Sequence, residues 1–140
     1  MVLKKSLRAI GLMSGTSGDG IDVAYIESDG STISYLGKSG TYPYSDDFRK
    51  QLNVNKVTSA NYHQVEKILT LLHYDAVQDF LRVNKLDALE IDLVGFHGHT
   101  IQHNPDKLIS IQIGDGKLLA EMLKITVFHD FRSNDIMHGG

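Results

Sequence analysis

The first forty residues carry the patterns that are typical of antiparallel strands. Residues 7–13 and 21–26 are two apolar runs separated by a stretch of small residues, and together they predict a hairpin. A turn signal at Asp29-Gly30 leads into 32–41, which is rich in β-branched and aromatic residues. The pattern therefore predicts three consecutive antiparallel strands.

The spacing of apolar residues changes to a helical period after Pro43. Ser45 supplies a helix cap, and the two aspartates that follow give a short helix an acidic first turn. A longer helix is predicted over 61–83, because its apolar positions recur every three or four residues and would bury one face. These positions are Val65, Ile68, Leu69, Leu72, Ala76 and Phe80.

The last fifty residues alternate between strand and helix patterns. Residues 91–96 are typical of a buried strand, and 109–113 alternate strictly between isoleucine and polar residues. Asp115 can cap a helix over the leucines that follow, and 126–131 returns to a strand pattern. The order βββ-α-α-β-β-α-β predicts one α/β domain, a mixed sheet of five or six strands flanked by helices.

Composition and charge narrow the classes of function. Apolar residues are 41% and charged residues 22% of the chain, as in ordinary soluble globular proteins. The net charge of -3 gives no basic footprint, so neither nucleic acid nor an anionic membrane is expected as a partner. No stretch approaches the roughly 20 apolar residues of a membrane span. Arg8 interrupts the run that a signal peptide would need, and cysteine is absent, so we expect a cytoplasmic protein.

A glycine-rich stretch joins the first two predicted strands. Residues 11–22 read G-L-M-S-G-T-S-G-D-G-I-D, and glycine lets a backbone approach a ligand closely because no Cβ stands in the way. Exposed N–H groups in such a turn bind anions, and the hydroxyls of Thr16 and Ser17 add donors. The glycines can equally serve turn geometry alone, and composition does not favour either anion binding or a simple turn. The stretch lacks the lysine of a P-loop.

Asp19 and Asp22 lie in the same stretch and would repel a bare phosphate group. They make sense if one of them holds a Mg²⁺ ion, directly or through water, since magnesium keeps several of its waters.

A histidine-rich segment follows the predicted strand 91–96. Polar groups at the carboxyl ends of strands commonly line ligand sites in open α/β sheets, and His97, His99 and His103 lie there. A zinc site is the alternative, but the spacing H-x-H-x₃-H matches no H-E-x-x-H pattern and includes no carboxylate. Ordinary polar loop histidines are the more common case. The other histidines are expected to be unrelated to this cluster: His63, His73, His129 and His138.

A third polar segment, 130–135, follows the last predicted strand. Arg132 could hold a carboxylate or a phosphate through its planar guanidinium group. A structural ion pair with Asp130 or Asp135 is the more common role for a lone D-x-R.

Four blocks of this sequence together resemble the anhydro-N-acetylmuramic acid kinases. They are G-L-M-S-G-T-S-G-D-G-I-D at 11–22, G-F-H-G-H-T at 95–100, Q-I-G-D-G at 112–116 and D-F-R-S-N-D-I-M-H-G-G at 130–140. They occur in the family's order and at its usual spacing, which is specific where one block alone would be weak. The resemblance implies an actin-like and hexokinase-like ATPase fold, with a ribonuclease H-like first lobe over 1–140 and a second lobe absent from this chain.

The resemblance also implies an activity and a set of site residues. The family uses ATP to phosphorylate O6 of 1,6-anhydro-N-acetylmuramic acid while water opens the anhydro ring, giving N-acetylmuramic acid 6-phosphate for cell-wall recycling. The resemblance therefore favours nucleotide binding by the glycine-rich stretch, with Mg²⁺ at Asp19. The stretch comprises Gly15, Thr16, Ser17, Gly18, Asp19, Gly20, Ile21 and Asp22. The implied amino-sugar contacts are His97, Thr100 and Arg132, the last with the lactyl carboxylate.

The sequence departs from the family pattern at three points. Gly18 stands where the family usually has leucine, and His99 stands where it usually has glutamine. Family members are more than twice as long, and their catalytic aspartate lies in a G-F-D-T-G-P-G-N-type segment that these residues do not contain. No catalytic residue is therefore expected in this chain. It could be half of a split enzyme completed by a second polypeptide, a homo-oligomer, or a truncated remnant that binds nucleotide or a partner lobe without catalysis.

Overall fold

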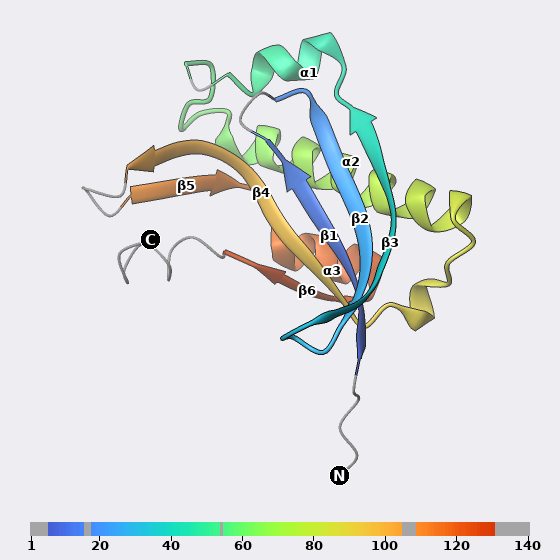
Figure 1. Cartoon of the computed structure of the whole chain (residues 1–140). Coiled ribbons are helices and arrows are strands. Elements are labelled where there is room, and N and C mark those ends of the chain that lie inside the picture. The colour runs from blue at the N-terminus through green and yellow to red at the C-terminus, as the bar shows by residue number, and fades with distance from the viewer. Residues whose placement is uncertain (1–5, 16–17, 54, 105–108, 131–140) are drawn as a thin grey trace.

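The computed structural model describes residues 6–15, 18–53, 55–104 and 109–130 (Figure 1). The predicted order of strands and helices is confirmed, with one short 3₁₀ turn added before the fourth strand. The elements are β1 (Leu7–Ser14), β2 (Gly20–Ser28), β3 (Ile33–Pro43), α1 (Asp46–Gln51), α2 (Tyr62–Val83), η1 (Ala88–Glu90), β4 (Leu93–Asn104), β5 (Ile109–Ile113), α3 (Gly116–Leu123) and β6 (Thr126–His129).

The strands form one six-stranded mixed sheet with the order β3-β2-β1-β4-β5, and β6 also pairs with β4. The first three strands are antiparallel neighbours, as predicted. β1 and β6 both run parallel to β4, whereas β5 runs antiparallel to it. The carboxyl ends of β1, β4 and β6 therefore point toward the same edge of the sheet, and this arrangement positions the candidate site.

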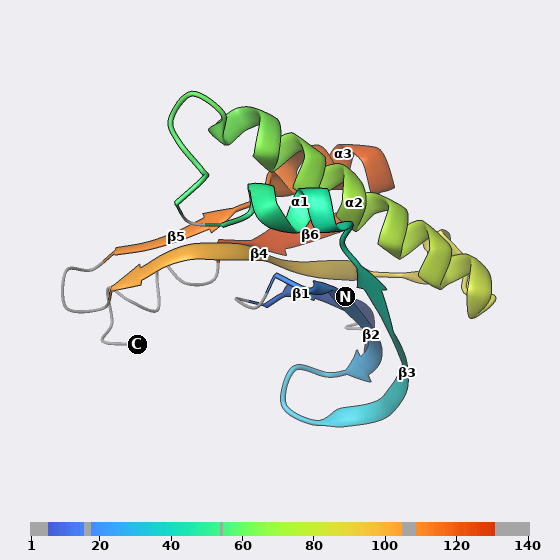
Figure 2. The same ribbon diagram turned by 90° about the horizontal axis from the view of Figure 1, so that it is seen from above.

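The three helices lie on one face of the sheet (Figure 2). The apolar face of α2 packs on the sheet as its period predicts: Val65, Leu69, Ala76 and Phe80 are buried, and Ile68 and Leu72 are partly buried against the same core. From the sheet, Ile10, Val23 and Val94 face this layer and are fully buried. Among the described residues, no helix covers the opposite face of the sheet.

The two predicted helix caps are present. The Ser45 hydroxyl accepts a hydrogen bond from the Phe48 N–H (3.2 Å), and the Asp115 carboxylate accepts one from the Leu118 N–H (3.0 Å). Both bonds satisfy N–H groups that the first turn of a helix leaves without a partner.

The fourth strand differs from its prediction. The pattern predicts a strand over 91–96 followed by a polar tail, but β4 begins at Leu93 and continues to Asn104. The polar residues extend the strand because their backbone groups pair with β5 from His99 onward. The last strand, predicted over 126–131, ends at His129, and Phe131 lies outside the described residues.

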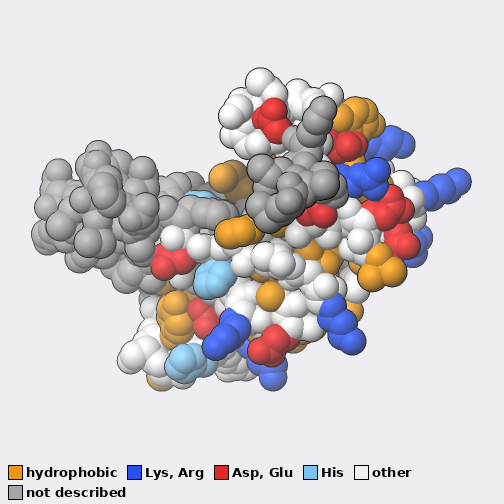
Figure 3. Space-filling model, turned by 90° about the horizontal axis from the view of Figure 1, so that it is seen from below, with side chains coloured by type: hydrophobic (Ala, Val, Ile, Leu, Met, Phe, Trp, Pro, Cys, Tyr) orange, Lys and Arg blue, Asp and Glu red, His pale blue; other side chains and the backbone are white. Residues whose placement is uncertain are grey.

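Charged side chains of both signs are interspersed over the face seen from below (Figure 3). Within the described part of the chain, no helix is both long enough and apolar enough to cross a membrane.

Candidate functional site

Three of the sequence blocks, and Asp130 at the start of the fourth, meet at the carboxyl edge of the parallel strands. Leu12 pairs with Phe96 and Phe96 pairs with His129, so these three positions lie level across β1, β4 and β6. The glycine-rich loop, the histidine segment and Asp130 all follow that level. The third block joins them, because a Cβ at Gly114 would lie 2.7 Å from the Phe96 ring. Blocks that are far apart in the sequence are thus brought to one place.

The glycine-rich loop has a defined backbone at its described flanks. The Gly18 N–H donates to the Gly15 carbonyl (2.9 Å), and the Tyr44 N–H donates to the Asp19 carbonyl (2.9 Å). Gly18 has a φ of +67°, and a Cβ at Gly20 would lie 2.5 Å from the Tyr42 carbonyl oxygen. Turn and strand geometry therefore account for these two glycines without a ligand. The predicted contacts Thr16 and Ser17 lie outside the described residues.

The carboxylates of the two aspartates in the loop have different partners. The Asp19 carboxylate is 70% exposed and lies 3.1 Å from an Arg49 guanidinium nitrogen. The Asp22 carboxylate accepts a hydrogen bond from the Thr41 hydroxyl (2.9 Å) on β3. The Ile21 side chain is buried in the core, which leaves only its backbone for a ligand. Within the described residues, no three His, Asp or Glu side chains are grouped as metal ligands.

A bulge in β4 separates two of the three clustered histidines. Leu12 pairs with Phe96, but Ser14 pairs with His99, so β4 has one extra residue over this interval. Gly98 absorbs the irregularity with a φ of +75°. As a result His99 turns inward and is buried, with Nδ1 2.9 Å from the Ser14 hydroxyl oxygen, whereas His97 is only partly buried. Burial lowers the pKa of His99 below its usual value.

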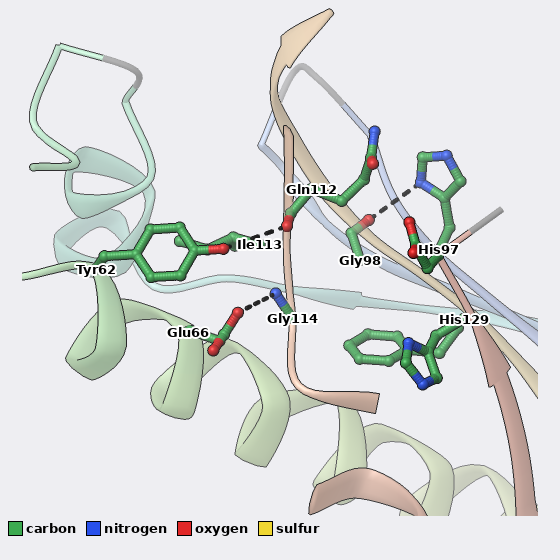
Figure 4. Close-up of a pocket in the computed structure, with 10 residues that line it drawn as sticks. Tyr62, Glu66, His97, Gly98, Gln112, Ile113, Gly114 and His129 are labelled. Carbon is green, nitrogen blue, oxygen red and sulfur yellow. Dashed lines mark hydrogen bonds between the residues drawn. The ribbon is translucent and has the colours of Figure 1, made fainter. Parts of the chain in front are cut away.

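A hollow of about 320 Å³ opens beside the bulge (Figure 4). It is lined by residues of α2, β4, β5 with the link to α3, and β6 with the residue after it. Its polar members are Tyr62, Glu66, His97, Gln112, His129 and Asp130. The Glu66 carboxylate accepts a hydrogen bond from the Gly114 N–H (3.2 Å), and the His97 Nδ1–H donates to the Gly98 carbonyl (3.2 Å). Donors and acceptors that face one hollow suit a ligand rich in hydroxyl groups.

One expectation about the histidines is wrong. His129 was expected to be unrelated to the cluster, but it lines the same hollow as His97 because β6 pairs with β4. His73 lies in the core instead, where its ring packs edge-on against Phe96, with centroids 4.8 Å apart. Hydrophobic periodicity gives no signal for either contact, because both depend on pairing between distant segments.

The remaining predicted sugar contacts lie at the same edge of the sheet or outside the described residues. The Thr100 hydroxyl accepts a hydrogen bond from the Gln112 side-chain amide (3.3 Å), which joins the second and third blocks. Arg132 and Asp135 lie outside the described residues. A second hollow, of about 570 Å³, lies where His97, Gly95 and Asp22 line the helix-free face of the sheet.

Comparison with known proteins identifies the family. The family model for anhydro-N-acetylmuramic acid kinase matches residues 7–140. Curated relatives named anhydro-N-acetylmuramic acid kinase come from Agrobacterium fabrum (43% identical), Paramagnetospirillum magneticum (47%) and Brucella canis (45%). The alignments cover 94%, 94% and 95% of this chain but only 38%, 37% and 38% of the relatives. This chain belongs to the anhydro-N-acetylmuramic acid kinase family, and it spans well under half the length of these relatives.

Proposed function

We propose that this chain supplies the phosphate loop and part of the sugar site of an ATP-dependent kinase. The proposed reaction converts 1,6-anhydro-N-acetylmuramic acid to N-acetylmuramic acid 6-phosphate, with opening of the anhydro ring. The observation that carries the proposal is the convergence of three of the family's blocks, and of Asp130 from the fourth, at one sheet edge around a polar hollow. Because ATP is the proposed phosphoryl donor, the cytoplasm is the proposed compartment.

The nucleotide side of the proposed site is the loop from Gly15 to Asp22. Its backbone N–H groups are proposed to face the ATP phosphates, as in other anion-binding turns. Asp19 would hold a magnesium ion as a single ligand in exchange for its ion pair with Arg49, because Mg²⁺ commonly uses one or two carboxylates, with waters and substrate phosphates completing its shell. The Asp22 carboxylate is engaged as well, by the Thr41 hydroxyl. A Mg²⁺ ion there would neutralise phosphate charge, which is a main requirement of phosphoryl transfer.

The sugar side of the proposed site is the hollow beside β4. His97 lines it directly, and Thr100 reaches it through its bond to Gln112. Glu66 and His129, which the sequence did not indicate, are proposed to add hydrogen bonds to sugar hydroxyls. Arg132 is proposed to bind the lactyl carboxylate, because a guanidinium group binds carboxylates in a planar, two-bond geometry.

The proposed chemistry combines ring opening with phosphoryl transfer. Water attacks C1 of the sugar and gives its proton to a base, the C1–O6 bond breaks, and O6 takes the γ-phosphoryl group as ADP leaves. The base is proposed to lie in the second lobe, outside these 140 residues. This chain contributes positioning and charge neutralisation, which carry most of the catalysis in such transfers.

A second, narrower candidate concerns these 140 residues taken alone. We propose that they bind nucleotide but turn over no sugar without a second polypeptide or a second copy. Both candidates require the loop to bind Mg·ATP, so that binding is the property to test first.

Calorimetric titration of the purified chain with Mg·ATP tests the loop. We expect weak binding by the wild type, and loss of binding in Gly15→Val, because a β-branched side chain would occupy the space that a phosphate needs. Gly11→Val is the matched control, since a Cβ at Gly11 has no heavy atom within 4 Å. Equal binding by a folded Gly15→Val variant, or no heat from the wild type at millimolar Mg·ATP, would refute the assignment.

A further inference from the structure

Three buried side chains form a hydrogen-bonded chain beneath the glycine-rich loop, and the proposed function gives none of them a role. The Tyr44 hydroxyl donates to the Ser14 oxygen (2.8 Å), and this oxygen lies 2.9 Å from His99 Nδ1. The exposed fractions are 6% for Tyr44, 2% for Ser14 and 4% for His99. Buried polar groups without partners destabilise a fold, so a connected set of this kind is tolerated only when its members are bonded.

Two hydrogen bonds join the three side chains. The Tyr44 hydroxyl donates to the Ser14 oxygen, and the Ser14 hydroxyl shares the second bond with His99 Nδ1, as donor or acceptor according to the ring tautomer. Burial lowers the pKa of His99 and raises the pKa of Tyr44, so the imidazole is neutral and the phenol is protonated at neutral pH.

The three hydrogen-bonded side chains contact both described flanks of the loop. Ser14 is the last residue of β1 and directly precedes the loop. On the far flank, Tyr44 donates its backbone N–H to the Asp19 carbonyl (2.9 Å). Tyr44 is therefore bonded to both flanks, to Ser14 through its hydroxyl and to Asp19 through its backbone. The His99 ring lies under Gly18, where a Cβ would be 3.9 Å from His99 Cε1. The described loop backbone is thus hydrogen-bonded to Tyr44 at Asp19 and lies against the His99 ring at Gly18.

Three separate segments bring these side chains together. Ser14 comes from β1, Tyr44 from the link between β3 and α1, and His99 from β4. The bulge at Gly98 gives His99 its inward direction, because a regular strand would pair Ser14 with Gly98 instead. The Phe48 ring of α1 packs edge-on against Tyr44, with centroids 5.1 Å apart, and restrains the tyrosine ring.

We propose that Ser14, Tyr44 and His99 form a brace that sets the shape of the loop flanks, and that Tyr44 and His99 are positioning residues for the bound phosphate. This inference rests on the proposed phosphate-binding function of the loop. N–H groups that are already held in place bind an anion without a further ordering cost. Neither ring needs to touch the ligand, because each acts through Ser14 or the loop backbone.

Tyr44→Phe tests the brace by removing one hydroxyl while keeping the ring and the backbone N–H. Tyr25→Phe is the matched control, because Tyr25 is similarly buried and its hydroxyl bonds to Glu27, in β2 and away from the loop. Loss of one net hydrogen bond corresponds to a factor of roughly five in an opening equilibrium. We expect amide exchange at Gly18 to accelerate by about that factor in Tyr44→Phe alone, and Mg·ATP affinity to fall similarly.

A pair of substitutions at His99 tests the hydrogen bond to Ser14. The side-chain amide of His99→Asn can stand near the Nδ1 position and form a hydrogen bond with the Ser14 hydroxyl, whereas His99→Leu offers no polar group. We expect the Gly18 amide of the asparagine variant to exchange at the wild-type rate, and that of the leucine variant to exchange faster. Amides in the middle of α2, such as that of Val77, should change far less, which separates positioning from general destabilisation.

These measurements test the brace and the nucleotide role of the loop separately. Equal acceleration at Gly18 in Tyr44→Phe and Tyr25→Phe, or equal behaviour of the two His99 variants, overturns the brace. Parallel acceleration at Gly18 and Val77 also overturns it, because the residues would then only stabilise the fold. If the wild type binds no Mg·ATP while the exchange differences are observed, the loop's nucleotide role fails and its bracing stands.

Discussion

Acid should destabilise this fold through His73, whose imidazole lies between α2 and the sheet. The side chain is fully buried, its Nδ1–H donates to the Leu69 carbonyl (2.8 Å), and its ring packs against Phe96. Its Nε2 atom has no hydrogen-bond partner among the described residues. A protonated ring would place a charge and a second N–H donor in this apolar layer. Burial accordingly lowers the pKa of His73 from 6.5 to about 4.

The magnitude follows from proton linkage. Between pH 6.5 and about 4 the unfolded chain binds a proton at His73 that the folded chain does not, so the free energy of unfolding falls as the pH falls. Since each pKa unit corresponds to 1.36 kcal/mol, the loss at pH 4 amounts to about 3 kcal/mol. Burial lowers the pKa of His99 too, which acts in the same direction. A domain with about 5–15 kcal/mol of stability would lose a substantial fraction.

Urea unfolding followed by circular dichroism at pH 7 and pH 4 measures this loss. We expect His73→Leu to reduce the pH dependence by about 2–3 kcal/mol, because leucine is close in volume and takes up no proton. His63→Leu is the control, since His63 lies on the same helix but is exposed. An unchanged pH dependence in His73→Leu, or an NMR titration of His73 with a midpoint near 6.5, would refute the reasoning.

Three further predictions concern turnover, the metal and the bulge. The isolated chain should form no 6-phosphate product from the anhydro sugar, because the proposed base lies outside it, and sugar-dependent ADP release above an ATP-hydrolysis blank would contradict this. Asp19→Asn should weaken ATP binding chiefly when Mg²⁺ is present, and calorimetry showing an equal effect without Mg²⁺ would exclude a metal role. Gly98→Ala should cost about 2 kcal/mol or more, because a Cβ there would lie 2.6 Å from the Ile113 carbonyl oxygen at a φ of +75°. Gly30→Ala, which has positive φ but no neighbour within 4 Å, controls for backbone strain in urea titrations, and equal costs would contradict the packing argument.

Features that depend on near neighbours were predictable from the sequence. The buried face of α2 follows from apolar spacing, and the caps at Ser45 and Asp115 follow from short polar side chains before a helix. The hairpin of β1 and β2 follows from two apolar runs around a glycine-rich turn. In each case the residues that determine the structure lie within a few positions of one another.

Features that depend on distant pairing were missed. The bulge at Gly98 exists because β4 must match β1 on one side and β5 on the other, and no local pattern encodes that mismatch. His129 reaches the hollow only through the pairing of β6 with β4. Family resemblance located the four blocks but not Tyr44, which precedes the cap of α1 and carries no motif of its own.

The pairing of β1 with β4 also bears on the order in which the protein folds. Ser14 and His99 are 85 residues apart, whereas the strands of the β1–β2–β3 meander are joined by short connections. Closing a long loop costs more chain entropy than closing a hairpin, so contacts of large sequence separation tend to form late. During synthesis the glycine-rich turn would emerge and pair long before His99 leaves the ribosome. We therefore expect the nascent chain to carry a hairpin whose loop is contacted by His99 only after β4 has docked. The proposed binding of phosphate would then be one of the last properties to appear during folding.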